Sequence, residues 1–242
     1  MSFELVLQYL LSPTFFHGAV MTLLITVSSL VFGLLAGLVL ALINQVKFPP
    51  IQWLAMFYLW LFRGTPVLFQ IIFIYNVLPT FGIRLSAFAS GVIALSLNEG
   101  AYMAEIIRSG LQAIKNGQRT AGLALGMTKL TVMRYIVMPQ AARIMLPPIG
   151  NQTIGMLKTS ALVSVIAVEE LLLIANQTAS ATFRYFEALS AAGIYYLALT
   201  TVFMAGQYWM ERSLEPMRKR HAKPSILAIL FKPATNGTED NR

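Results

Sequence analysis

Several residue types that carry chemistry in other proteins are missing or rare in this chain. Cysteine is absent from the 242 residues, and histidine occurs twice, as His17 and His221. Without cysteine, neither a disulfide framework nor a thiolate metal site can form. Two histidines leave little for imidazole chemistry, so we expect neither a metal site nor a catalytic residue here.

Charged residues are also scarce. Asp, Glu, Lys and Arg make up 12% of the chain, while 57% of the residues are apolar. A soluble domain usually carries about 25% charged residues. Packing of a soluble core does not explain this deficit, so the composition indicates a protein that is integral to a membrane.

Phosphate-binding and nucleophile motifs are missing as well. The sequence contains no Gly-x-x-x-x-Gly-Lys-Ser/Thr loop and no Gly-x-Ser-x-Gly elbow, so we expect no ATP hydrolysis by that route and no cofactor in this chain. The alternative of a membrane-embedded enzyme would need a catalytic set of residues, and none is recognisable in this sequence. The internal repeat of a complete secondary transporter is not evident either, so the energy must come from a partner or a gradient.

Five windows reach the length of a membrane span, which is about 20 mainly apolar residues. They cover residues 18–43, 52–78, 87–112, 148–175 and 187–211. The first is too long, and too far from a basic segment, to be a cleaved signal peptide. We therefore predict an all-α integral membrane protein with about five transmembrane helices. Five spans are few for a complete carrier, which favours a pathway formed between two subunits.

The basic residues of the connections predict the orientation. One side receives Lys47, Lys115, Arg119, Lys129, Arg134, Arg143, Arg212, Arg218, Lys219, Arg220 and Lys223. The other side receives Arg84 and Arg184, and Arg184 has the spacing of a local ion pair with Glu187. By the positive-inside rule the N-terminus lies outside and the C-terminus in the cytoplasm. The basic run MRKRHAK is then a topology and headgroup signal rather than a nucleic-acid patch, and residues 217–242 form a cytoplasmic tail.

The stretch LWLFRGTPVLFQ interrupts the second span with polar and helix-breaking residues. Pro66 lacks an N–H and clashes with the carbonyl one turn earlier, near Phe62, while Gly64 adds backbone freedom. We expect a kink or unwound turn that faces protein or a water-filled cavity, as in the substrate sites of many transporters. Gly64, Thr65 and Pro66 are predicted to line the pathway. Arg63 could bind a substrate carboxylate or pair structurally with an acid.

The third span carries further polar groups. Asn98, Tyr102 and Glu105 follow i, i+4, i+7 spacing and share one helix face. Arg108 extends that face and predicts an internal, structural ion pair with Glu105, which would lower the cost of burying both charges. Glu99 is expected to point elsewhere, about 100° round the helix.

The fourth span carries Thr159 and Ser160, followed about three turns later by Glu169 and Glu170. We predict a small polar cavity lined by a set from the third and fourth spans: Asn98, Tyr102, Thr159, Ser160 and one of Glu169 or Glu170. A carboxylate suits a substrate ammonium group, and hydrogen-bond donors suit an α-carboxylate. The alternative is that these groups form interhelical hydrogen bonds at a dimer seam.

The inner loop, residues 113–147, is long and patterned. Gln118, Gly122 and Gly126 recur every four residues and would share one face of a helix over residues 117–127. A small-residue face allows close approach to another surface, which favours a soluble partner with a groove. The alternative is an amphipathic helix that rests on the lipid surface.

This loop resembles the EAA loop of ABC-importer permease subunits. In GQRTAGLALGM and the later IVMP, Ala121, Gly126, Ile136 and Pro139 stand at family positions. The chain departs from the family pattern at three places: Thr120 replaces Glu, Gly122 replaces the second Ala, and Met138 replaces Leu. Further segments are similar to the polar-amino-acid subgroup in order along nearly the whole chain, including RGTPVLFQIIFIY, NEGAYMAEIIRSGLQAI and TFRYFEAL.

The resemblance implies a fold, partners and a mechanism. Residues 1–216 would form a MetI-like type I ABC importer transmembrane domain. The partners would be a second permease (the same or a different chain), two ABC ATPases that bind ATP and Mg, an extracytoplasmic solute-binding protein, an amino acid and membrane lipid. The ATPase-coupling residues would be Gly117, Gln118, Thr120, Ala121, Gly122, Leu125, Gly126 and Pro139.

The expected function is that of a permease subunit in the bacterial cytoplasmic membrane, which moves a polar amino acid by alternating access. The alternative is an autonomous channel or gradient-driven carrier, which gives no role to the small-residue helix of the inner loop.

Overall fold

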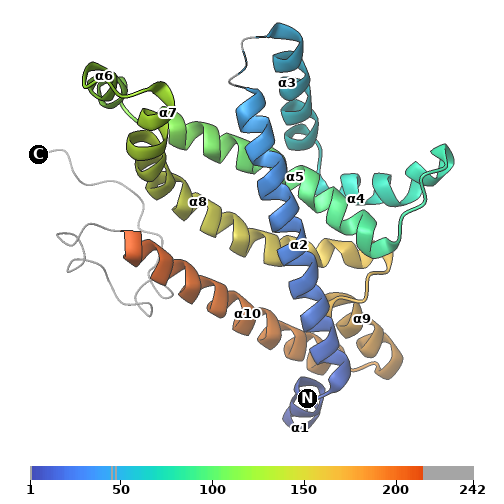
Figure 1. The fold of residues 1–242 in the computed structure, drawn as a ribbon. Coiled ribbons are helices and arrows are strands. Elements are labelled where there is room, and N and C mark those ends of the chain that lie inside the picture. Colours follow the sequence, from blue (N-terminus) through green and yellow to red (C-terminus); the bar gives the residue numbers. More distant parts are fainter. Residues whose placement is uncertain (1, 45, 47, 215–242) are drawn as a thin grey trace, which may run out of the picture.

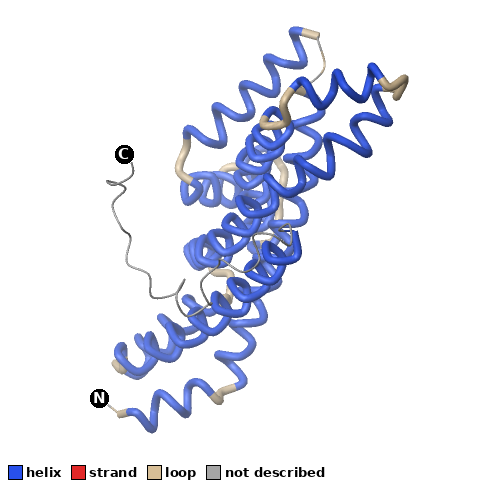
Figure 2. Tube along the Cα trace, turned by 90° about the vertical axis from the view of Figure 1, so that its left-hand side faces the viewer, coloured by secondary structure: helices blue, strands red, loops and turns tan. Residues whose placement is uncertain are grey.

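The computed structural model describes residues 2–44, 46 and 48–214. The predicted tail, residues 217–242, and the basic residue Lys47 lie outside this range. Within it, every regular element is helical (Figures 1 and 2). The elements are α1 (Phe3–Leu10), α2 (Pro13–Ile43), α3 (Pro49–Gly64), α4 (Val67–Asn76), η1 (Leu78–Phe81), α5 (Ala87–Gln112), α6 (Asn116–Ala124), α7 (Lys129–Val132), η2 (Met133–Val137), α8 (Met138–Thr159), η3 (Ser160–Ile166), α9 (Leu171–Thr182) and α10 (Tyr185–Leu214).

The membrane-crossing elements are partly as predicted. Of the described helices, α2 and α10 are each long and apolar enough to cross a membrane, and α3 with α4 passes as one span bent by 104°. The count of five spans stays a prediction. The fourth predicted window is not one continuous helix, because α8 ends at Thr159 and Ala167 turns the chain with φ +60° before α9 begins.

Serine side chains cap the N-termini of α2 and α5. Ser12 accepts a hydrogen bond from the Phe15 N–H (3.3 Å) ahead of α2, where Pro13 occupies the first helical position. Ser86 accepts from the Ala89 N–H (3.2 Å) at the start of α5. These caps satisfy backbone donors that a helix N-terminus leaves free, so each helix begins at a fixed residue.

α2 and α5 cross in close contact near the middle of the molecule (Figure 1). A Cβ added to Gly33 would lie 2.7 Å from the Glu99 Cβ, and one added to Gly37 would lie 2.5 Å from the Met103 Cβ. Gly33 and Gly37 are one turn apart, in the small-xxx-small pattern of membrane helix pairs. This contact fixes α5, which carries most of the polar residues considered below.

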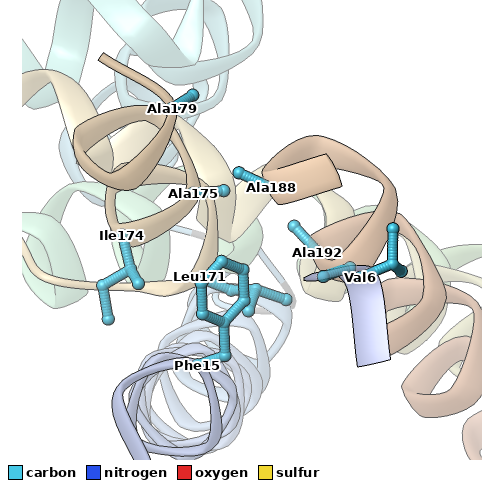
Figure 3. Packing of buried hydrophobic residues seen from close by; sticks show 9 residues of the cluster. Val6, Phe15, Leu171, Ile174, Ala175, Ala179, Ala188 and Ala192 are labelled. Carbon is cyan, nitrogen blue, oxygen red and sulfur yellow. The ribbon is translucent and has the colours of Figure 1, made fainter. Parts of the chain in front are cut away.

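A second core lies at the end of the molecule that holds the N-terminus. Val6, Phe15, Leu171, Ala175 and Ala188 bring together α1, α2, α9 and α10 (Figure 3). The Tyr195 hydroxyl donates to the Leu10 carbonyl (2.7 Å) and secures α1 against α10. α6 and α7 lie at the opposite end of the molecule from α1 (Figure 1).

The inner-loop helix is shorter than the sequence predicted. α6 ends at Ala124, and Gly126 follows it with φ +81°. The Met127 N–H reaches the Gly122 carbonyl (3.1 Å), which is the hydrogen bond of a left-handed C-terminal cap. Gly126 therefore terminates the helix, and its predicted place on a shared helix face with Gln118 was wrong.

Gly122 is buried within this chain. A Cβ added there would lie 2.8 Å from the side chains of both Val132 and Ile136. The small residue at this position thus allows α6 to pack on the turn formed by α7 and η2. That packing corrects the expectation that Gly122 faces outward toward a partner, whereas Gln118 and Thr120 are exposed.

Candidate functional site

A cavity of about 410 Å³ lies where the break between α3 and α4 meets α5 and α8. We call it the central cavity. Its wall consists of Thr65, Pro66 and Val67 from the break, Leu95, Asn98, Glu99 and Tyr102 from α5, and Gln152, Gly155, Met156 and Thr159 from α8. The residues from α5 and those from α8 each follow i, i+3, i+4, i+7 spacing, so each set forms one stripe of a helix.

The break between α3 and α4 follows from Pro66. Thr65 adopts an extended conformation (φ −115°, ψ 146°), as expected for a residue before proline. The Phe62 carbonyl, one turn before Pro66, loses its helical partner. It accepts instead from the Gln70 Nε2 (3.0 Å) and the Asn98 Nδ2 (2.9 Å). The predicted interruption is confirmed, and side chains satisfy its backbone.

Gln70 organises this region. Its Nε2 also donates to the Thr65 carbonyl (3.1 Å) and hydroxyl (2.8 Å), and its Oε1 accepts from the Asn98 Nδ2 (3.2 Å). Gln70 is 5% exposed. Gln70 was not among the predicted site residues, although a glutamine four positions after a helix-breaking proline is well placed to replace the hydrogen bond lost there.

Glu99 is the charged residue in the wall of the central cavity. Its side chain is 4% exposed, and its Oε1 has no hydrogen-bond partner among the described residues. A buried carboxylate oxygen without a partner costs free energy, and such groups concentrate at functional sites. The expectation that Glu99 points away from Asn98 and Tyr102 was wrong, because a stripe about 100° wide has room for residues 98 and 99 at its two edges.

Arg63 lies next to the central cavity rather than in its wall. Its guanidinium lies over the Tyr102 ring, 5.7 Å from the centroid, and its Nη1 is 3.9 Å from the Glu105 Oε2. Glu105 also forms the predicted ion pair with Arg108. Both arginines are more than 40% exposed, so the pair is not internal to this chain. Gly64 does not line the cavity, and a Cβ added to it would meet nothing within 4 Å.

Three residues of the predicted cavity lie elsewhere. Ser160 is buried and donates to the Leu157 carbonyl (2.8 Å). Glu169 is exposed. Glu170 caps α9 through the Leu173 N–H (2.8 Å) and accepts from the Tyr196 hydroxyl (2.8 Å). These contacts place Glu170 in the core near the N-terminus, so the prediction that one of these acids lines the cavity with Asn98 was wrong.

The remaining predicted residues take two positions. Thr65, Pro66, Asn98, Tyr102 and Thr159 come together around the central cavity. Three further wall residues were not predicted, Gln152, Gly155 and Met156, although their helical spacing with Thr159 was a usable signal. The predicted ATPase-coupling residues lie on and after α6: Gly117, Gln118, Thr120, Ala121, Leu125 and Pro139 are exposed. Near the N-terminus, Arg184 lies 3.9 Å from Glu187.

Comparison with known proteins adds independent information. The profile of a family described as "Binding-protein-dependent transport system inner membrane component" matches residues 29–216. The arginine transport system permease protein ArtQ of Bacillus subtilis is 39% identical over 204 residues, which are 84% of this chain and 93% of ArtQ. The glutamine transport system permease protein GlnP of Escherichia coli is 38% identical over 192 residues, which are 78% of this chain and 88% of GlnP.

Solved structures agree with these relatives. A crystal structure of an amino acid ABC transporter with histidines contains a chain that is 41% identical, with a TM-score of 0.82. The match covers 88% of this chain and 99% of that one. A chain of the MetNI methionine ABC transporter in an inward-facing conformation matches with a TM-score of 0.72 at 17% identity, which is evidence for the fold alone.

Proposed function

This chain belongs to the family of binding-protein-dependent transport system inner membrane components, and from that membership we propose that it is the permease subunit of an ATP-driven amino-acid importer. The resemblance drawn from the EAA-like loop is confirmed, as are the MetI-like helical fold and the location in the bacterial cytoplasmic membrane. The substrate, the coupling and the partners below are proposals.

The proposed topology has five spans, with the N-terminus outside and α6 in the cytoplasm. Two observations support it. α1 and α6 lie at opposite ends of the molecule (Figure 1), and the basic residues gather in the connections on the α6 side. In this topology the bent pair of α3 and α4 would cross the membrane, so the Pro66 break and the central cavity beside it would lie within the bilayer.

The central cavity is the proposed solute site, and two features of opposite polarity support this. The N-terminus of α4 begins at Val67 in the cavity wall, and free backbone N–H groups at such an end attract a carboxylate. Glu99 offers a buried carboxylate oxygen without a partner to a cationic nitrogen. An amino acid carries both groups, so we assign its carboxylate to α4 and a cationic nitrogen to Glu99.

The proposed energy source is a pair of ABC ATPases that bind ATP and Mg²⁺. They would dock on the exposed residues of α6, including Gln118 and Thr120. A solute-binding protein would deliver the amino acid outside, and a second permease would close the pathway. Closure of the ATPases would then move α6 and switch the cavity between outward and inward access, a rigid-body mechanism without covalent chemistry in this chain.

The observation that carries the proposal is the central cavity, which joins a broken helix to an unpaired buried acid. We would purify the chain with its co-purifying ATPase and solute-binding protein, reconstitute the complex in vesicles, and measure amino-acid uptake. The expected result is uptake that requires ATP and the binding protein. Equal uptake without ATP would favour the autonomous channel or carrier and overturn the proposal.

A further inference from the structure

A second cavity, of about 190 Å³, lies where the end of α5 meets α2, α6 and η2. We call it the end cavity. Its polar wall is formed by Asn44, the residue that follows α2, by Arg108 and Gln112 from α5, and by Arg119 from α6. Two guanidinium groups thus face a small space, and the wall contains no carboxylate among the described residues.

The two arginines differ in how their charge is balanced. Arg108 pairs with Glu105, and its Nη1 donates to the Gln112 Oε1 (2.8 Å). Arg119 donates from its Nη2 to the Leu111 carbonyl (3.0 Å), near the end of α5. Its Nε is buried and has no acceptor within the described chain. Arg119 therefore has a full positive charge and a free, directional N–H, with no acid to balance them.

A buried N–H of a charged group needs an acceptor, and a bound ion or an ordered water is one way to supply it. The tetrahedral oxygens of a phosphate match the fork of a guanidinium, which binds them through two parallel hydrogen bonds. The neighbouring amide groups of Asn44 and Gln112 supply further polar contacts of the kind that phosphates accept.

We propose that the end cavity binds a phosphate-type anion through Arg119, with Arg108 beside it. Two sources supply this chemistry, the headgroup of an anionic phospholipid and free inorganic phosphate. The proposed topology places the cavity at the cytoplasmic surface of the membrane, where anionic lipids gather and attract arginine. That location depends on the proposed function, but the anion site does not.

The test varies the charge at position 119. Arg119→Gln removes the charge and keeps a polar amide, while Arg119→Lys keeps the charge. Arg134→Ala is the matched control, because Arg134 is an exposed arginine that lies over the Tyr135 ring and does not line the cavity. Each variant is purified as the complete transporter, and size-exclusion chromatography checks that it is assembled.

Native mass spectrometry then measures retained phosphatidylglycerol after transfer from vesicles of phosphatidylcholine with one quarter phosphatidylglycerol. We expect the wild type and Arg134→Ala to retain it equally, and Arg119→Gln to bind it about fivefold more weakly. Arg119→Lys should lose less. In a second arm, inorganic phosphate is added to detergent-solubilised protein; Arg119-dependent binding of phosphate instead of lipid supports the site and assigns the soluble source.

Equal retention of both probes by the wild type and Arg119→Gln would overturn the proposal, as would failure of the wild type to bind either. Neither readout requires transport. A failed uptake assay with intact phosphate or lipid binding would therefore count against the importer and leave the anion site standing.

Discussion

The central cavity and the end cavity are built on the same helix and have opposite charge. The central cavity has Glu99 as its charged group, and the end cavity has Arg108 and Arg119. Each contains one buried polar atom without a partner in the described chain, the Glu99 Oε1 and the Arg119 Nε. The two proposals follow this difference in sign: a cationic nitrogen is assigned to the first cavity and an anion to the second.

The two cavities also differ in how their walls are held. The central cavity depends on a broken helix whose backbone Gln70 and Asn98 satisfy. The end cavity depends on the contact between α6 and the last turn of α5, where the Arg119 guanidinium donates to the Leu111 carbonyl. Arg108 follows Glu99 by nine positions on α5, a rise of about 13 Å. The single helix α5 therefore supports both cavities, and a variant can disturb one cavity alone or the packing of α5 itself.

The largest effect is expected for Glu99→Gln. Loss of a charge-assisted hydrogen bond of about 1.5–3 kcal/mol to the solute should weaken solute-stimulated uptake about tenfold to a hundredfold. Thermal stability should not fall, since the variant removes an unpaired buried charge. Glu169→Gln, at an exposed acid outside the cavity, should leave uptake unchanged. The reverse pattern would move the cation site to the second acid.

A smaller effect, shared by both cavities, is expected when α2 is pushed away from α5. In Gly37→Ala the new Cβ would lie 2.5 Å from the Met103 Cβ and 2.9 Å from the Ala104 backbone nitrogen. Overpacking of this kind costs about 1–3 kcal/mol, measurable by SDS-induced unfolding. Gly206→Ala on α10 meets nothing within 4 Å, so it should be neutral or slightly stabilising. Equal stability of the two variants would contradict the close α2–α5 contact.

Gln70→Leu should affect the central cavity alone. It removes the donor that serves the Phe62 and Thr65 carbonyls, and the expected loss of stability is about 1–2 kcal/mol. Solute affinity should fall with it, while phosphatidylglycerol retention at the end cavity stays unchanged. Gln177→Leu, at an exposed glutamine of α9, is the control. A loss of lipid retention in Gln70→Leu would show that the structure of the end cavity depends on that of the central cavity.

The smallest effect is expected for Gly126→Ala, just after the end of α6. The left-handed backbone at residue 126 (φ +81°) would then carry a Cβ, at a cost of about 1 kcal/mol. Gly117→Ala, where the φ angle is not left-handed and no atom lies within 4 Å of the new Cβ, should cost nothing. Unfolding curves of the two variants measure the difference. An equal shift would mean that Gly126 does not terminate α6.

Features governed by local geometry could be predicted from the sequence. Pro66 acts through its own ring and the preceding turn, so the break and the freed Phe62 carbonyl follow without knowledge of the fold. The helical spacing of Asn98 and Tyr102 likewise predicted that they share one face of their helix, and both line the central cavity. The correct predictions therefore depended on the covalent geometry of proline and on the repeat of a single helix.

Features governed by tertiary contacts could not be predicted in the same way. Glu170 is held by Tyr196, which is 26 residues away, and no spacing within its own segment reveals that contact. The position of Gly126 fits the repeat of a helix that continues to residue 127, and it fits equally well the residue just after a shorter helix. Only the backbone conformation, with φ +81°, distinguishes the two. Glu99 was misplaced because adjacent residues can border the same stripe.

α5 runs without interruption from the wall of the central cavity to the wall of the end cavity, and this has a thermodynamic consequence. If an anion bound in the end cavity alters the affinity for solute in the central cavity by some factor, the solute must alter the affinity for the anion by that same factor. Reciprocity of this kind needs no assumption about which group moves first. The concentration of the anion, whether lipid or phosphate, and the concentration of the solute would then affect the transporter through one shared coupling free energy.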